Sequence, residues 1–385
     1  MTITYPGVEI REIPSGVRTL AGVATSVTAF VGTATDGPLN TPVTINNFGD
    51  YERAFGGLAL TSRMSYAVRD YYLNGGSRAV FVRDGDDDAT AVEGDYEGSE
   101  TGKTGIYALE DTDIFNMMCI PNMVDSGSTR SAAAAAYCLK KRAFLIMDSP
   151  AAWATKQDAI DGLAALRKNR NVALYFPHLR QPEPLDSNAV KDFAPCGAVA
   201  GIIARTDTNR GVWKAPAGLE ATFNNVPELS VQISDEENGE LNPLAINVLR
   251  IKPPAGRVVW GARTIVGFDN STEGEWRYVP VRRLALNIEE SLFRGTQFVV
   301  FEPNDEQLWS QIRLNLGAFM QDLFRRGAFQ GTSPAQAYFV KCDAENNPQS
   351  DIDKGIVNIL VGFAPLKPAE FVVISLQQIA GQLAT

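Results

Sequence analysis

The middle of the chain contains three residue types that hydrolases combine: a carboxylate at Asp148, a hydroxyl at Ser149 and an imidazole at His178. In a catalytic triad the imidazole removes the proton of the hydroxyl while the carboxylate orients the imidazole. The surroundings do not favour this chemistry, because Ser149 precedes Pro150 without a Gly-x-Ser-x-Gly elbow, and no paired carboxylate stands at a set spacing. Turn and cap roles explain these side chains better, and we predict no catalytic residues.

Metal and nucleotide sites have equally little support. His178 is the single histidine, which excludes metal sites of two or more imidazoles. The segment Gly98-Ser-Glu-Thr-Gly-Lys-Thr104 resembles a phosphate-binding loop, but three residues separate its glycines where that loop needs four. We therefore expect Lys103 to be solvated and predict no cofactor. Four cysteines are scattered without a Cys-x-x-Cys pair, so we expect small core residues: Cys119, Cys138, Cys196 and Cys342.

Composition indicates an ordinary globular protein. The chain has 385 residues, of which 45% are hydrophobic and 21% charged, enough for about two or three domains. The net charge of -10 argues against nucleic acid as a partner, because phosphate binding needs concentrated Lys and Arg. The sequence begins without a secretion signal, and no run of about 18 apolar residues could span a bilayer. We expect folding in the cytoplasm and no stable membrane insertion.

Apolar runs alternate with helical segments over residues 115–203, which predicts a parallel sheet covered on both faces, and residues 23–83 before it predict an α/β opening. Strands are expected at 23–32, 43–45, 78–83, 105–109, 115–120, 142–147, 171–176 and 197–203, and helices at 48–56, 62–74, 129–139, 155–168 and shortly before 197. Ligands of such folds bind beyond the carboxyl ends of the strands. The residues to inspect there are Pro121, Asp148, Ser149, His178 and Asp207.

The C-terminal third predicts an α+β unit around one long helix. Asn304 and Gln307 have capping-box spacing and Gly327 suits a left-handed cap, so the helix should run from about 305 to 326. Its apolar stripe should face the core and its polar side should stay available. A helix at 281–294 and a strand at 297–301 precede it, and strands at 337–341 and 355–363 follow as a hairpin.

Two alternating, proline-flanked strands lie near the ends of the chain, at 5–13 and 370–377. Each could fold back onto its own sheet or pair with the open edge of a neighbouring chain. The pattern alone leaves both possibilities open.

Several motifs resemble the contractile tail sheath protein family of phages, tailocins and extracellular contractile injection systems. The most specific are Gly211-Val-Trp-Lys-Ala-Pro-Ala217 and Val259-Trp-Gly-Ala-Arg-Thr264. The resemblance extends over nearly the whole chain, although the acidic segment 84–104 matches nothing in the family. Further matching segments are 5–10, 30–34, 55–57, 241–247, 276–283 and 319–331.

The resemblance implies an α/β plus α+β architecture with extended arms. Its parts would be an N-terminal arm at 1–20, a first α/β segment at 21–110 with an exposed insert at 84–104, a parallel-sheet α/β domain at 111–265, a C-terminal α+β core at 266–364 and a C-terminal arm at 365–385. The implied function is structural. Subunits form a homo-oligomer of stacked rings around an inner tail tube, with baseplate and tail terminator proteins as further partners, and contract to drive the tube through a cell envelope. After assembly in the cytoplasm, the protein would belong to a virion tail or an extracellular particle.

Strand exchange between subunits would use two sets of residues, namely Val8, Glu9, Ile10 and Arg11 in the N-terminal arm and Phe371, Val372, Val373 and Ile374 in the C-terminal arm. The polar face of the long helix would contact the tube through Arg313, Gln321 and Arg325. Arg282 and Arg283 are further candidates for subunit contacts. The alternative is a hydrolase-like α/β enzyme with an oligomerisation domain, which would use Asp148, Ser149 or His178.

Overall fold

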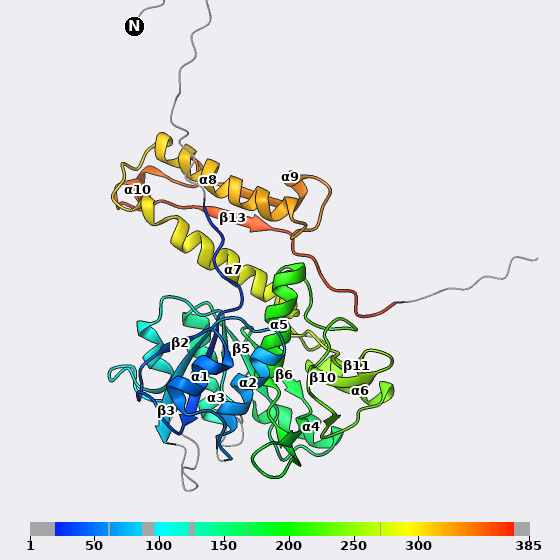
Figure 1. Ribbon diagram of the computed structural model, residues 1–385. Coiled ribbons are helices and arrows are strands. Elements are labelled where there is room, and N and C mark those ends of the chain that lie inside the picture. The colour runs from blue at the N-terminus through cyan, green and yellow to red at the C-terminus, as the bar shows by residue number, and fades with distance from the viewer. Residues whose placement is uncertain are drawn as a thin grey trace, which may run out of the picture.

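The computed structural model describes residues 20–60, 62–86, 96–121, 123, 128–166, 168–269 and 271–372. It contains a large α/β unit and a smaller unit built around the long helix α8 (Glu306–Arg325). Figure 1 shows the smaller unit stacked on the larger one, with helix α7 (Val279–Gly295) running from one to the other.

The large unit contains an eight-stranded sheet in the order β11-β10-β6-β5-β4-β1-β3-β2. Its six central strands are parallel, whereas β2 and β11 pair antiparallel at the two edges. The predicted parallel sheet is therefore confirmed for the centre, and the whole sheet is mixed. The strands are β1 (Thr28–Ala34), β2 (Val43–Ile45), β3 (Ala79–Asp86), β4 (Met117–Cys119), β5 (Phe144–Asp148), β6 (Val172–Phe176), β10 (Ile246–Lys252) and β11 (Gly256–Val259).

Helices cover both faces of this sheet. Successive residues of β5 point to opposite sides, so Leu145 and Met147 join one apolar core while Phe144 and Ile146 join the other. The first core also takes in α3 (Ser128–Lys140), α4 (Lys156–Gly162) and α6 (Asp235–Leu241), and the second takes in α1 (Phe48–Phe55), α2 (Arg63–Leu73) and α5 (Cys196–Arg210). All four cysteines are buried, as predicted.

Helix α5 is the largest departure from the sequence prediction. We expected a strand at 197–203 because the run is apolar throughout, but a short apolar run does not distinguish a buried strand from a buried helix. The structure has a helix, and its residues from Cys196 to Ala204 are all buried. Gly197 and Gly201 lie one turn apart and let the backbone of α2 approach closely. Asp207 therefore lies on this helix instead of following a strand.

The segment expected to be helical before residue 197 also differs. It forms a hairpin of β7 (Leu179–Glu183) and β8 (Ala189–Phe193), which joins β9 (Glu228–Leu229) in a separate three-stranded sheet. Its partner strand β9 is distant in sequence, so local patterns gave no signal for it.

Three shorter predictions are wrong or only partly right. Residues 105–109 belong to the 3-10 helix η1 (Gly105–Asp111). Residues 297–301 form the 3-10 helix η6 (Gln297–Val299) and a turn in which Phe301 has a left-handed backbone. The helix expected at 155–168 ends at Gly162 and continues as η3 (Leu163–Ala165). β-branched residues raise strand propensity, but tertiary packing overrides that preference here.

The smaller unit follows the prediction more closely. The apolar stripe of α8 is buried as expected, and Gly327 has the predicted left-handed backbone at φ 79°. Asp305, not Asn304, caps the helix by accepting from the Leu308 N–H at 2.9 Å, while Asn304 accepts from the Trp309 indole. Strands β12 (Tyr338–Lys341) and β13 (Leu360–Phe363) form the expected hairpin, and β13 is shorter than the predicted 355–363. Short helices α9 (Pro334–Ala337) and α10 (Gln349–Ile352) flank β12 in the sequence.

The close approach of α2 and α5 gives a test of this packing. A Cβ atom at Gly197 would overlap the main-chain oxygen of Ala67. We expect Gly197→Ala to lower the free energy of unfolding by about 1–3 kcal/mol, because overpacking forces the helices apart. Urea denaturation followed by circular dichroism would measure the change.

The matched control is Gly239→Ala in α6, where an added Cβ meets no atom within 4 Å. That change should leave stability unaltered or raise it by up to about 1 kcal/mol through helix propensity. Equal effects of the two substitutions would contradict the packing argument.

Candidate functional site

The two-stranded sheet of the smaller unit has outer edges that no other described strand pairs with. One face of the sheet packs against α7 and α8 in the interior, through Tyr338, Val340, Val361 and Phe363. The opposite face carries Phe339 and Leu360, whose exposed fractions are 52% and 53%. The two strands are supported by the helices on one face only, and an open edge is a template for another strand. This sheet is therefore the feature of the fold best suited to bind a further chain.

An asparagine network fixes the long connection between β12 and β13. Asn347 is buried, and its side-chain amide donates to the main-chain oxygens of Asp343 at 3.0 Å and Asn358 at 3.2 Å. Its side-chain oxygen accepts from the Asn358 N–H at 2.6 Å. The network closes the connection just before β13 and sets the register of the hairpin.

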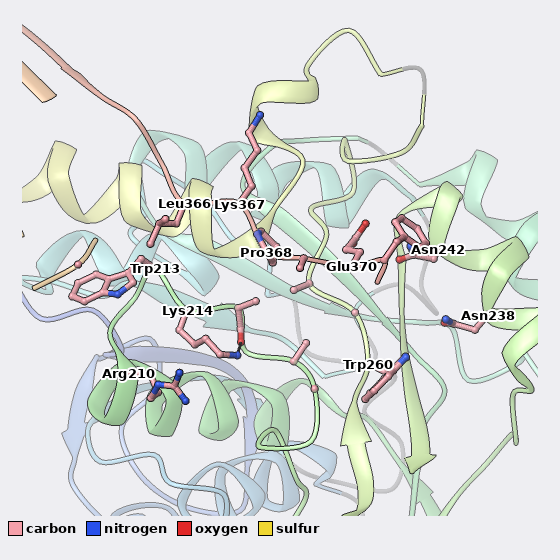
Figure 2. A pocket seen from close by; sticks show the side chains of 18 residues that line it. Arg210, Trp213, Lys214, Asn238, Asn242, Trp260, Leu366, Lys367, Pro368 and Glu370 are labelled. Carbon is pink, nitrogen blue, oxygen red and sulfur yellow. Dashed lines mark hydrogen bonds between the residues drawn. The ribbon is translucent and has the colours of Figure 1, made fainter. Parts of the chain in front are cut away.

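After β13 the chain leaves the smaller unit as an extended strap, which we define as residues 364–372. Ala364 is hydrogen-bonded to Ala337 and Gln330, and residues beyond it run along the large unit. There the strap borders a cavity of about 700 Å³. Figure 2 shows Leu366, Pro368 and Glu370 in a row from the side of Trp213 toward Asn242.

The strap contains the first half of the predicted C-terminal contact set. Phe371 and Val372 have exposed fractions of 77% and 80%. Val373 and Ile374 lie outside the described residues, as do the N-terminal set Val8, Glu9, Ile10 and Arg11. The described part thus presents two apolar side chains to solvent where the strap ends.

Glu370 is tied to the buried Arg263 of the large unit. The guanidinium donates from Nε to Oε1 at 2.9 Å and from Nη2 to Oε2 at 2.5 Å. Its Nη1 donates to Asp269 at 3.1 Å and to the Asn242 oxygen at 3.1 Å. Burial alone would lower the pKa of Arg263, but the hydrogen bonds and charges of Glu370 and Asp269 outweigh it and raise the pKa. The Arg263 guanidinium therefore stays charged although it is buried.

The described N-terminal chain is held by α7. Val23 donates its N–H to the Ser291 hydroxyl at 3.1 Å, and the Asn287 amide donates to the Val23 oxygen at 3.2 Å. Leu20 packs against the apolar residues of the smaller unit. The chain thus descends along α7 before it enters β1.

Arg282 and Arg283 do not lie on the surface, so their expected role at subunit contacts is wrong. Both side chains are buried near the start of α7. Arg283 forms an ion pair with Asp207 at 2.6 Å, and Arg282 donates to Asn171 at 2.7 Å. Burial lowers the pKa of Arg282. These two side chains hold α7 against the large unit, and their position between the helix and that unit explains their burial.

The three residues predicted on the polar side of α8 have different surroundings. Arg313 donates to Glu306 at 2.6 Å and to the Cys342 oxygen, and the Gln321 side chain accepts from the Tyr338 hydroxyl at 2.7 Å. Arg325 is exposed at the end of the helix. Other side chains of the exposed face are Gln311, Leu314, Ala318 and Asp322.

The residues considered for catalysis come together but are not arranged as a triad. Asp148, Ser149 and His178 are all buried. The His178 ring contacts the main-chain oxygen of Ser149 at 2.8 Å, and Asp148 accepts from the Cys196 N–H at 2.7 Å. These contacts join the ends of β5 and β6 to α5. Pro121 follows β4, and Lys103 pairs with Asp111.

Within the described ranges, no group of three or more His, Cys, Asp or Glu side chains is suited to a metal ion. Nor does that part of the chain include a helix with the length and apolarity needed to span a membrane.

Comparisons with known proteins decide the family. The model of the phage tail sheath protein central domain matches residues 94–265, and that of the phage tail sheath C-terminal domain matches residues 271–379. The chain belongs to the contractile tail sheath family. The resemblance seen in the sequence motifs is confirmed.

Two curated phage proteins are similar to part of this sheath chain. The tail sheath protein of Enterobacteria phage T4 is 28% identical over 169 residues, which is 43% of this chain and 24% of that protein. The tail sheath protein of Vibrio phage KVP40 is 24% identical over 180 residues, or 46% and 25% of the two chains. The matches thus span about a quarter of the length of these relatives.

Solved structures match the sheath chain over almost its entire length. The PVC sheath complex of an extracellular contractile injection system, in its contracted state, has a TM-score of 0.79 and 28% identity, with 98% of both chains covered. The helical sheath of the anti-feeding prophage, also contracted, has a TM-score of 0.77 and 29% identity over 98% of this chain and 100% of that one. A sheath tail protein from Listeria innocua shares the fold, with a TM-score of 0.58 and 12% identity.

Sequence reasoning about this sheath protein missed the roles of Arg263, Glu370 and Asn347. Arg263 stood inside a recognised motif, and an arginine between apolar residues is a signal of a buried ion pair. Its partner lies 107 residues away, so only the fold reveals the contact. The division into arms and domains stays a prediction.

The asparagine network in the sheath hairpin can be tested directly. We expect Asn347→Ala to destabilise the smaller unit by about 1–3 kcal/mol, because the Asn358 N–H loses its acceptor and the main-chain oxygens of Asp343 and Asn358 each lose one donor. Hydrogen exchange should become faster in β12 and β13. Gln349→Ala, at an exposed position of the same connection, should have almost no effect. Unchanged exchange in the Asn347 variant would contradict the assigned role.

Proposed function

We propose that this protein is the repeating subunit of a contractile sheath that surrounds an inner tube and drives it through a target cell envelope. The observation that carries the proposal is the match over 98% of the chain to contracted sheaths of the PVC and anti-feeding prophage particles. Those sheath chains are covered almost completely, whereas the phage proteins are matched over a quarter of their length. We therefore favour a particle of the injection-system kind, assembled in the cytoplasm.

Strand exchange is the proposed link between subunits. Residues 1–20 and 365–385 would act as arms that add strands to the β12–β13 sheet of neighbouring chains. In support, both edges of that sheet are open among the described residues, and both arms have the alternating pattern of a strand. Full burial of Val8 and Ile10 would contribute about 1.5–3 kcal/mol each before ordering costs.

Contraction would be a rigid-body change between two packings of the same subunits. The large unit is braced by two apolar cores and the buried pair Arg283–Asp207, so it is suited to move as a block. The free energy would be stored in the extended array and released as contacts are exchanged, without nucleotide. A baseplate and a tail terminator would be further partners.

The tube would contact the polar face of α8. Arg325 is the strongest of the three predicted residues because its side chain is exposed, while Arg313 and Gln321 make bonds within the subunit. The alternative enzyme has no comparable support, because Asp148, Ser149 and His178 are buried, and main-chain groups bind the Asp148 carboxylate and the His178 ring.

Electron microscopy of the purified full chain is the first test. We expect long striated cylinders from residues 1–385 and none from a version that lacks residues 1–15, because the N-terminal arm would no longer link neighbouring subunits. Discrete small particles from both versions would contradict the proposed function.

Charge reversal tests the tube contact. We expect Arg325→Glu to weaken the extended sheath on its tube and to leave the contracted sheath intact, because contraction moves subunits away from the tube. Counting extended and contracted sheaths in micrographs of isolated particles would measure this. Lys354→Glu, at an exposed position near α10, is the matched control and should change neither count. Equal loss of both forms in the Arg325 variant would contradict the assignment.

A further inference from the structure

Within the described ranges, the strap, which forms the first part of the proposed arm 365–385, is hydrogen-bonded to the large unit through a single side chain. Among the described residues, every hydrogen bond from 366–372 to the rest of the chain involves the Glu370 carboxylate. Apolar packing does little to hold this segment, since Leu366, Phe371 and Val372 are all exposed and a cavity of about 700 Å³ lies beside it. The position of the strap therefore depends on Glu370.

The site that binds the Glu370 carboxylate is formed by residues of the large unit. The side chain of Arg263 is 2% exposed, and two of its three nitrogens face the carboxylate in the bidentate arrangement that fits a guanidinium. The third nitrogen is occupied by Asn242, Gly267 and Asp269. Asp269 is half exposed and turned to that third nitrogen, so it does not replace Glu370. Without Glu370, a buried cation would lose its main counter-charge.

We propose that Arg263 and Glu370 form a latch that fixes the point at which the C-terminal arm leaves its subunit. Glu370 is then a positioning residue for strand exchange, and this inference rests on the proposed function. The latch assigns the start of the arm to the large unit, although the preceding strand β13 belongs to the smaller one. The arm therefore pivots after Glu370 and not at the end of β13.

Geometry shows why such a latch matters. Glu370 lies seven residues after Phe363 in the chain, so an unlatched strap could carry the start of the arm anywhere within roughly 24 Å of β13. Fixing that point raises the effective concentration of the arm at one edge of a neighbouring sheet and lowers it elsewhere. Phe371 and Val372, the first apolar residues beyond the latch, are thereby held in one place.

Assembly of the full chain tests the latch. We expect Glu370→Ala and Glu370→Gln to reduce the fraction of protein in sedimentable cylinders by about tenfold, with unchanged secondary structure. The control is Glu289→Gln, which removes the carboxylate partner of the equally buried Arg282 but does not touch the strap. That variant should assemble like the wild type. Wild-type yields from both Glu370 variants, or an equal loss in the Glu289 variant, would overturn the proposal.

A second measurement on the unassembled chain separates failure of the latch from failure of the proposed function. Spin labels on cysteines placed at Val372 and Glu236 can report the distance from the strap to α6, because the four native thiols are buried. We expect one narrow distance distribution, which Glu370→Ala broadens. Distributions of equal width would overturn the latch even if cylinders form. If the wild-type chain shows a narrow distance distribution but forms no cylinders, the latch is supported and the proposed sheath function is contradicted.

Discussion

Burial of the central sheet on both faces is the constraint on which the rest of the molecule depends. Every residue of β5 and β6 is buried, and their side chains alternate between two separate apolar cores. Helices must then cover both sides, and the close contact of α2 with α5 follows from the two glycines that permit it. A platform of this kind resists internal deformation. It can therefore support side chains that need fixed positions.

The positions that this platform fixes are those of charged groups at the junction of the two units. Arg282 and Arg283 hold the start of α7, and Arg263 holds the strap. Buried ion pairs contribute little net stability, but removing one partner is costly, so they define geometry more than they add free energy. Apolar packing at these places would let the segments slide, whereas the bidentate pairs Arg283–Asp207 and Arg263–Glu370 hold them in register.

The sequence predicted the parts of the fold that local patterns determine. The apolar stripe and the glycine cap of α8 can be recognised from the local sequence alone. The same holds for the alternating strands and helices around β4, β5 and β6. Helix α5 was missed because a run buried on all sides has no period. The β7–β8 hairpin was missed because Pro182 lies inside its first strand, and a proline in a run argues against a strand. The family motifs located Arg263 but gave no role to it, since its carboxylate arrives from 107 residues away.

The hairpin of the smaller unit has two unlike edges, one on β12 and one on β13, and the chain reaches and leaves it by different routes. A chain that offers unlike surfaces joins its copies head to tail, and joints of that kind do not close on themselves by twofold symmetry. An array built this way has a direction, so its two ends present different surfaces. Its geometry also does not limit the number of subunits that it contains. Where such an array begins and how far it grows must then be decided by other molecules at its ends or along its axis.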